Sequence, residues 1–168
     1  MIILGIDPGT TRIGWAILKT KKKDILPIDY GCWELKEKEQ EKRLLKISQN
    51  INKAIKTYKP DVLAIEKIFF FKNAKTVMSI SEATGVIILT AQKHKLPCIR
   101  LTPLEIKQNL IGYGRADKKD VQKLIQLVFS LKEIPKPDDT ADALAVALAG
   151  INKINQKIKG KKTNEKNL

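Results

Sequence analysis

Two carboxylates in this sequence stand where short apolar runs end. Asp7 closes the run at residues 2–6, and Glu66 closes the run at residues 62–65. Each run has the length of a strand, and open α/β sheets form their sites at the carboxyl ends of adjacent parallel strands. If the two strands are neighbours, the carboxylates face one another across about 4.8 Å. The alternative for Asp7 is a purely structural role at the start of the Pro-Gly turn that follows it.

A second acidic pair lies in the segment PDDTADALAVALA. Asp139 and Asp142 are three residues apart, which places both on one face of a helix near its N-terminus. Their structural alternatives are a helix cap for Asp139 and a favourable interaction with the helix dipole for Asp142. Glu66 has an alternative too, as a solvated strand end.

Four carboxylates in one place would repel and raise one another's pKa. Divalent cations would relieve that repulsion. A donor set of carboxylate oxygens without His or Cys points to Mg²⁺, with Mn²⁺ as a substitute, rather than to zinc. Two such ions about 3.5–4 Å apart can hold a phosphate, activate water and stabilise the leaving oxygen. The chemistry predicted from these residues is therefore phosphodiester hydrolysis.

The charge of the chain indicates a polyanionic partner. The net charge is +14 and the isoelectric point about 9.8. Nucleic acid is favoured over an anionic membrane surface, because the sequence has no basic amphipathic helix with aromatic anchors. Lys-rich surfaces also arise from heat adaptation, so the charge supports this partner without establishing it.

The length of 168 residues predicts one domain, which we place at residues 1–156, followed by a basic, disordered tail at residues 157–168. The sequence has no apolar span long enough to cross a bilayer, and Asp7 interrupts the first apolar run before a signal-peptide core could form. A cytoplasmic protein without membrane partners is expected. Cys32 and Cys98 are expected to be buried, reduced thiols.

Apolar spacing and turn residues predict an α/β fold in which three meandering strands precede alternating strands and helices. The expected strands are residues 2–6, 13–18, 25–33, 62–65 and 97–101. The expected helices are residues 44–58, 73–93 and 103–110, one after Asp117 with an apolar face that includes Val128, and one from Asp138 or Asp139. Gly85 inside the second helix is expected to permit close packing. The result is a five-stranded mixed sheet with helices on both faces.

Four stretches of the chain resemble the RuvC-type Holliday junction resolvases along nearly the whole length: LGIDPGTTRIGWAI, LAIEKIFFFKNA, IKQNLIGYGRADKKDVQ and DDTADALAVA. The resemblance implies a ribonuclease-H-like fold and a homodimer. It also implies Mg²⁺-dependent cleavage of four-way DNA junctions by symmetric nicks that ligase can seal, and a branch-migration motor complex as partner. The metal-binding acids that it implies are Asp7, Glu66, Asp139 and Asp142. Asp138, beside Asp139, leaves the third acid open.

The same resemblance implies DNA contacts. Lys107 and Lys118 correspond to lysines that contact DNA or support catalysis, and Phe69 to an aromatic that stacks on an unpaired base at the crossover. Lys118 has an independent rationale, because it begins a helix behind a Gly-rich loop and could offset charge on the transferring phosphate. Arg115 is expected to contact the DNA backbone. Three consecutive Phe residues, 69–71, cannot all point the same way, so which one stacks is open.

Resolving a two-fold symmetric junction requires two cuts, and this chain carries one acidic site. A two-fold dimer would present two sites related like the two target strands. The helix at residues 73–93 is the candidate interface, with small or flexible side chains near one face. These are Ala74, Met78, Ser81 and Gly85. The only histidine, His94, is expected to have no catalytic part.

Three alternatives use the same features. The turn DPGT also resembles the phosphate loop of the actin, sugar-kinase and chaperone ATPases, but those proteins need a second such core, for which this chain is too short. No ATP turnover is therefore expected. A non-catalytic junction-binding protein would keep the basic surface and tolerate Asp7→Asn. A smaller resolvase-like nuclease acting on RNA is the third alternative.

Overall fold

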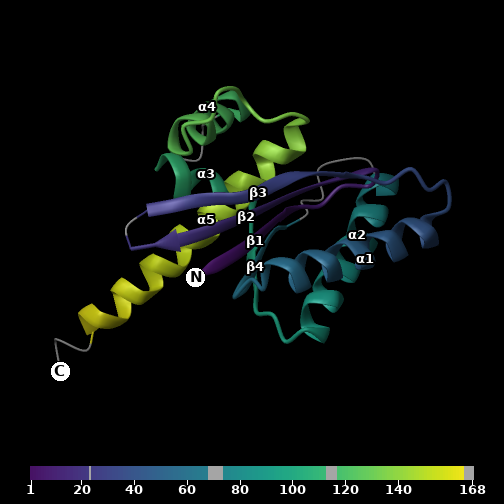
Figure 1. The fold of residues 1–168 in the computed structure, drawn as a ribbon, viewed down its shortest axis with the longest axis horizontal. Helices are drawn as coiled ribbons and strands as arrows, with labels where there is room; N and C mark the ends of the chain where they lie inside the picture. The colour runs from purple at the N-terminus through teal and green to yellow at the C-terminus, as the bar shows by residue number, and fades with distance from the viewer. Residues whose placement is uncertain (23, 68–73, 113–116, 165–168) are drawn as a thin grey trace.

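The structure, a computed structural model, describes residues 1–22, 24–67, 74–112 and 117–164 (Figure 1). Its strands are β1 (Ile2–Asp7), β2 (Arg12–Lys21), β3 (Asp24–Glu34), β4 (Val62–Glu66) and β5 (Cys98–Leu101). Its helices are α1 (Gln40–Tyr58), α2 (Ala74–Lys93), α3 (Pro103–Ile111), α4 (Lys118–Val128) and α5 (Asp138–Asn164). No helix of the described residues combines the length and the apolar character needed to cross a membrane.

The five strands form one sheet in the order β3-β2-β1-β4-β5. β1, β2 and β3 pair antiparallel, as a meander, whereas β4 runs parallel to β1 and β5 runs parallel to β4. The predicted mixed sheet is confirmed. Because β1 and β4 are parallel neighbours, their carboxyl ends meet at the same edge of the sheet.

Helices cover both faces of the sheet, as the sequence predicted (Figure 1). α5 lies on β1 and β2, with α3 and α4 packed beside it, and encloses one core. α1 and α2 pack together on the opposite face over a second core. Strand residues alternate between the two cores: on β2, Ile13 and Ile17 face α1 and α2, whereas Ala16 and Leu18 face α5.

α5 lies unusually close to the sheet because both surfaces carry very small residues. A Cβ atom on Gly5 of β1 would be 2.5 Å from the Cβ atom of Ala147 and 2.6 Å from the carbonyl oxygen of Ala143. A Cβ atom on Gly150 would be 2.8 Å from Ile3. Glycine in the strands and alanine along the helix therefore fix the depth at which α5 sits.

Three expectations about individual residues are corrected. Gly85 does not permit a close contact among the described residues, because a Cβ atom there would meet none of their atoms within 4 Å. Cys32 and Cys98 are free thiols but are half-buried rather than buried, because both lie on outer strands of the sheet. Val128 is 45% exposed, and Phe129 takes its place in the core as α4 ends.

The C-terminal segment is more regular than expected. α5 continues to Asn164, whereas the sequence predicted a disordered tail from residue 157. The segment has no proline or other helix-breaking residue apart from Gly160, so the helix that is anchored on the sheet can continue past it. Residues 165–168 lie outside the described part of the chain.

Candidate active site

The ends of β1 and β4 bring the first two acids together. Ile6 is in register with Ile65, so Asp7 and Glu66 follow at the same level of the sheet. The two carboxyl groups are close enough for each to shift the pKa of the other. The charge of Glu66 raises the pKa of Asp7, so the site disfavours two full negative charges.

The first turn of α5 supplies the other two acids. Asp7 pairs with Gly14 of β2, and a Cβ atom on Gly14 would be only 1.8 Å from the carbonyl oxygen of Asp139. The start of α5 therefore rests on the backbone of β2, next to the end of β1. Asp139 and Asp142 both raise the pKa of Asp7 by their charge. The four predicted acids thus converge on one end of the sheet.

Burial and mutual repulsion make this cluster reluctant to ionise. The pKa of Asp7 is well above its ordinary value, first because of burial and then because of the charges of Glu66, Asp142 and Asp139. Burial and the charge of Asp142 also raise the pKa of Glu66. The pKa of Asp142 is raised mainly by burial, although Lys118 opposes the shift. A cluster with this electrostatic penalty is poised for a cation.

Two basic side chains compensate part of the negative charge. Lys118 Nζ lies 2.9 Å from Asp142 Oδ2 and 3.4 Å from Asp138 Oδ2. Arg12 Nε lies 3.3 Å from Asp139 Oδ2. Sequence reasoning identified Lys118 but missed Arg12. The hairpin contained the signal, because Arg12 opens the strand that pairs with the one ending in Asp7.

The geometry separates the two adjacent aspartates left open by the sequence. The side chain of Asp138 is 63% exposed and turned toward Lys118, whereas that of Asp139 is 23% exposed and close enough to raise the pKa of Asp7. The position of Asp139 therefore favours it over Asp138 as the third acid.

The acids fit a divalent cation by chemistry, although their side chains are not yet arranged around one. Among the described residues, no three His, Cys, Asp or Glu side chains are grouped closely enough to ligate a single ion. Asp142 forms an ion pair with Lys118, and Asp139 forms one with Arg12. Asp139 Oδ2 is buried and, despite the nearby guanidinium, accepts no hydrogen bond. A free, buried carboxylate oxygen in an all-carboxylate donor set suits Mg²⁺ or Mn²⁺.

A cavity of about 390 Å³ adjoins the acids between α3, α4 and α5. Glu66, Asp142, Lys107 and Lys118 line its polar side, and Ile106 belongs to its apolar side. Lys118 is the first residue of α4, whose N-terminus is closed by a reciprocal pair of hydrogen bonds between Asp117 and Asp120. The two predicted DNA-contacting lysines therefore flank the acid cluster.

The remaining predicted DNA contacts lie outside the described residues. Phe69, with its neighbours 70 and 71, and Arg115 belong to this group. His94 hydrogen-bonds to Asn52 Oδ1 at 2.6 Å, between α2 and α1 and away from the acids. That contact gives His94 a structural role.

A ribonuclease-H-like sheet with carboxylates at the ends of its central parallel strands defines the class of protein: a nuclease that hydrolyses DNA. The family model described as "Crossover junction endodeoxyribonuclease RuvC" matches residues 3–150. The chain belongs to this RuvC family, whose members are metal-dependent nucleases.

Relatives of the chain carry the same description. The RuvC of Petrotoga mobilis is 48% identical over 148 residues, covering 88% of this chain and 91% of the relative. The RuvC of Fusobacterium nucleatum is 42% identical over 168 residues, covering 99% of this chain and 88% of the relative. The solved structure of T. thermophilus RuvC in complex with Holliday junction substrate superposes with a TM-score of 0.88 at 26% identity, covering 94% of this chain and 96% of that one.

Proposed function

We propose that this chain resolves four-way DNA junctions by paired symmetric nicks, with Mg²⁺ as its cofactor and Asp7, Glu66, Asp139 and Asp142 as metal ligands. The observation that carries the proposal is the convergence of these four acids. They come from three separate segments, and burial together with neighbouring carboxylates raises the pKa of Asp7, Glu66 and Asp142 in a protein with a net charge of +14. A merely structural role for them would not require so costly an arrangement.

The four carboxylates supply only oxygen ligands, which favours Mg²⁺ and allows Mn²⁺. When bound, two such ions would neutralise the cluster, hold the scissile phosphate and lower the pKa of the attacking water. Before Asp142 and Asp139 can bind these ions, Asp142 must break its ion pair with Lys118, and Asp139 must break its ion pair with Arg12. Because the ion pairs involve partly exposed side chains, each is worth only about 0–1 kcal/mol and is easily exchanged.

Lys118 is well placed to act on the phosphate once Asp142 is released. Its ammonium group lies at the edge of the cavity that adjoins the acids, and there it would stabilise negative charge developing on the transferring phosphate. Lys107 lines the same cavity from α3 and would contact the neighbouring backbone phosphate. Phe69 remains our proposed stacking residue at the crossover, and Arg115 our proposed backbone contact.

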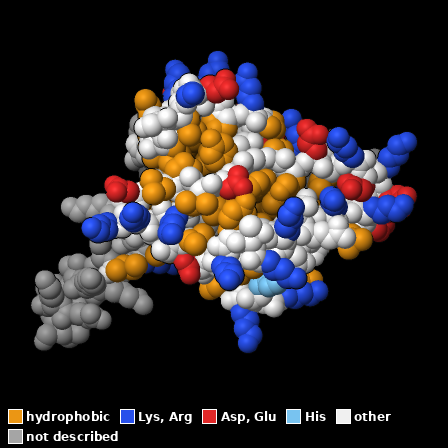
Figure 2. Space-filling view, in the orientation of Figure 1, with side chains coloured by type: hydrophobic (Ala, Val, Ile, Leu, Met, Phe, Trp, Pro, Cys, Tyr) orange, Lys and Arg blue, Asp and Glu red, His pale blue; other side chains and the backbone are white. Residues whose placement is uncertain are grey.

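Substrate binding beyond the site would come from the basic surface. Lys and Arg side chains are spread over the face drawn in Figure 2, with few acidic side chains between them. Contacts of this kind supply affinity and orientation for DNA without reading its sequence. Junction binding should accordingly weaken steeply with salt.

A homodimer is part of the proposal, and α2 offers the surface for it. Met78 is 67% exposed and Leu89 is 56% exposed, and between them the exposed Gly85 leaves open space above the helix. The exposed Ser81 and Glu82 lie on the same face, and a glycine at its centre allows two helices to approach closely. We expect sedimentation as a dimer, and expect Met78→Lys to shift the protein toward monomer. A chain that stays monomeric at micromolar concentration would contradict this part of the proposal.

We further propose a cytoplasmic location and a branch-migration motor complex as partner. Both rest on the family relationship. Pull-down of the protein with the motor proteins of the same organism, in the presence of a four-way junction, would test the partnership.

The decisive experiment uses a synthetic four-way junction, a linear duplex of the same sequence and an RNA–DNA hybrid, each with Mg²⁺. We expect symmetric nicks in the junction alone. Equal cutting of the linear duplex would contradict junction resolution, and preferential cutting of the hybrid would favour the RNA nuclease. The Asp7→Asn variant should bind the junction but not cut it, whereas a non-catalytic binding protein would make no cuts in either form.

A further inference from the structure

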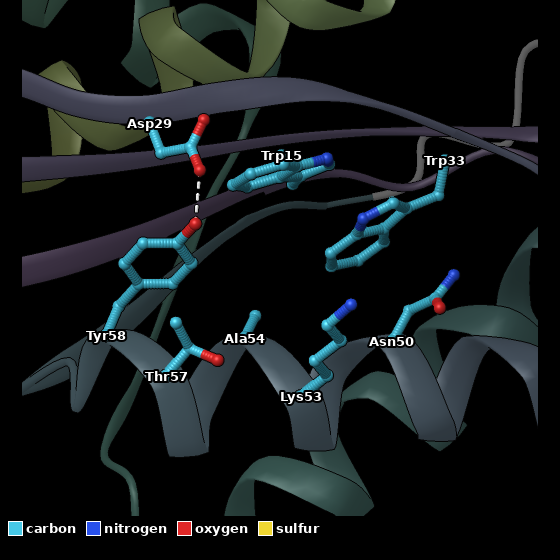
Figure 3. A pocket seen from close by; sticks show the side chains of 8 residues that line it. All are labelled: Trp15, Asp29, Trp33, Asn50, Lys53, Ala54, Thr57 and Tyr58. Carbon is cyan, nitrogen blue, oxygen red and sulfur yellow. Dashed lines mark hydrogen bonds between the residues drawn. The ribbon is translucent and has the colours of Figure 1, made fainter.

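A second cavity, of about 360 Å³, lies between α1 and the strands β2 and β3 (Figure 3). Two tryptophans, Trp15 of β2 and Trp33 of β3, form the side nearest the sheet. The opposite side consists of α1 side chains, and Tyr58 of this helix reaches up to Asp29 of β3. The residues from α1 that line the cavity are Asn50, Lys53, Ala54, Thr57 and Tyr58.

This cavity is separate from the acid cluster. Trp15 and Trp33 pack against the core beneath α1 and α2, whereas Asp139 and Asp142 belong to α5 on the other face of the sheet. The sheet itself lies between the two sites. The cavity lies where α1 passes over β2 and β3, and on this face Trp15 and Trp33 lie at the border of the core that contains Ile13 and Ile17.

Three aromatic rings gather at the cavity. The rings of Trp15 and Trp33 stack on one another at a centroid distance of 5.4 Å with an interplanar angle of 14°, and the ring of Tyr58 is tilted by 34° at 6.2 Å from Trp15. All three residues are only partly buried. A further flat ring can extend this aromatic stack, because base–aromatic stacking is favourable for every nucleobase.

The lining carries one acidic and one basic side chain, and only the basic one has no partner among the described residues. Asp29 is its only acidic residue, and both carboxylate oxygens are already engaged: one accepts from the hydroxyl of Tyr58 and the other from the backbone N–H of Tyr30. In the described part of the chain, the side chains of Asn50 and Lys53 make no hydrogen bond to protein. In Figure 3 the amino group of Lys53 points up from α1 toward the indole rings.

From this arrangement we infer a nucleobase-binding site, which takes a base stacked on the two indoles with its phosphate at Lys53. The amide of Asn50 can donate to and accept from the edge of the base. The volume lies at the low end for ligand sites, which suits one nucleotide better than an extended peptide. The nucleotide can be a free one or an unpaired one in DNA, and both offer the same base and phosphate. This inference does not depend on the proposed junction cleavage.

The chain provides its own reporter for this site. Trp15 and Trp33 are the only tryptophans in the sequence, so the intrinsic tryptophan fluorescence comes entirely from the cavity. We propose titrating the full-length protein, without divalent ions, with dTMP, dAMP, inorganic phosphate and a short single-stranded oligothymidylate. Saturable quenching by the nucleotides and none by phosphate is the expected result.

Two lysines of α1 make a matched pair for this test. Lys53 lines the cavity, and Lys56, one turn of helix onward, is exposed but does not line it. Lys53→Met should weaken nucleotide binding about tenfold, the usual worth of one charge-assisted hydrogen bond. Lys56→Met removes the same charge from the same helix and should leave the affinity unchanged. Equal effects of the two substitutions would indicate general electrostatic attraction and would overturn the inference.

Two further comparisons identify the source of the nucleotide. If the occupant is an unpaired nucleotide of DNA, the oligothymidylate binds more tightly than dTMP, and Lys53→Met also weakens junction binding. If it is a free nucleotide, dTMP or dAMP binds at least as tightly as the oligomer, and junction binding is unchanged. Absence of saturable quenching by dTMP, dAMP and the oligothymidylate, or equal quenching by inorganic phosphate, would contradict a nucleobase site.

Discussion

Gly14 of β2 touches the backbone of Asp139 so closely that a Cβ atom at residue 14 would lie 1.8 Å from the Asp139 carbonyl oxygen. Gly14 is also the residue paired with Asp7. One contact between a strand and the first turn of a helix therefore places the acid at the end of β1 beside the acids of α5. The geometry of the candidate active site depends on the absence of a single methyl group.

Gly14→Ala should damage both the fold and the site. The new methyl group must push the start of α5 off the sheet, which we expect to cost about 3 kcal/mol of the free energy of unfolding and to separate Asp139 from Asp7. Denaturant unfolding and junction cleavage would measure the two effects. Gly85→Ala is the matched control for the unfolding measurement alone, because Gly85 belongs to the proposed dimer surface. Its methyl group meets nothing within 4 Å in the described part of the chain, and it should stabilise the exposed helix of a protomer by about 0.5–1 kcal/mol. If the two substitutions change the free energy of unfolding equally, the contact between Gly14 and Asp139 does not position α5 on the sheet.

Asp7→Asn should abolish cleavage and yet stabilise the metal-free protein. The folded protein raises the pKa of Asp7, so ionisation of this group disfavours folding, increasingly as the pH rises from the unfolded pKa near 3.8 toward the raised folded pKa. The neutral amide removes that cost, for a gain of about 0.5–2 kcal/mol at neutral pH. Thermal unfolding in the presence of a chelator would measure it.

Added Mg²⁺ provides the control for this variant. It should raise the melting temperature of the unmodified protein by binding only the folded state, and should raise that of Asp7→Asn much less. Equal stabilisation of the two proteins by Mg²⁺ would show that Asp7 is not a ligand. Equal stability at all pH values in chelator would show that the acid cluster carries no electrostatic cost.

The sequence was sufficient to predict the sheet and the convergence of the acids, because both depend on local signals. Apolar runs of strand length ended at Asp7 and Glu66, and a three-residue spacing placed Asp139 and Asp142 on one helical face. Parallel pairing of β1 with β4 then required the two strand-end acids to meet. Hydrophobic patterning and chain connectivity determine all of these features.

Features that depend on contacts between distant side chains could not be predicted in the same way. The hairpin places Arg12 near the end of β1, but its contact with Asp139 also requires the position of α5 on the sheet. The stacking of Trp15 on Trp33 requires the register of β2 with β3. The role of Gly85 was misjudged for a related reason. A glycine in a helix indicates close packing only when its surroundings in the fold are known.

The adjacent aspartates at the start of α5 should differ sharply in importance. Asp139→Asn should reduce junction cleavage at least about a hundredfold, since it removes a carboxylate that interacts with Asp7. Asp138→Asn is the matched control at the neighbouring position. It removes only a 3.4 Å ion pair of an exposed side chain with Lys118, and cleavage should stay within about threefold of the unmodified protein. The reverse order of effects would assign the third acid to Asp138.

The pair Glu105–Lys153 should make the stability of the fold sensitive to acid. Lys153 Nζ of α5 lies 2.7 Å from Glu105 Oε1, and the other carboxylate oxygen of Glu105 accepts from the backbone N–H of Thr102 to close the capping box of α3. The hydrogen bond from Lys153, followed by that from Thr102, lowers the pKa of Glu105 from 4.5 to about 2. The unfolded chain therefore takes up a proton on this group first as the pH falls.

The stabilisation from Glu105 is consequently complete above about pH 4.5 and is lost as the pH falls toward 2. Glu105→Gln should lower the free energy of unfolding at neutral pH by about 1 kcal/mol, because it replaces a partly exposed ion pair and a charged cap. The difference between the two proteins should shrink between pH 4.5 and 2, since protonation makes the native side chain neutral as well. Urea unfolding across this pH range would measure it, with Glu41→Gln, an exposed acid in the first turn of α1, as control. A difference that stays constant down to pH 2 would show that Glu105 stabilises α3 by its shape rather than by its charge.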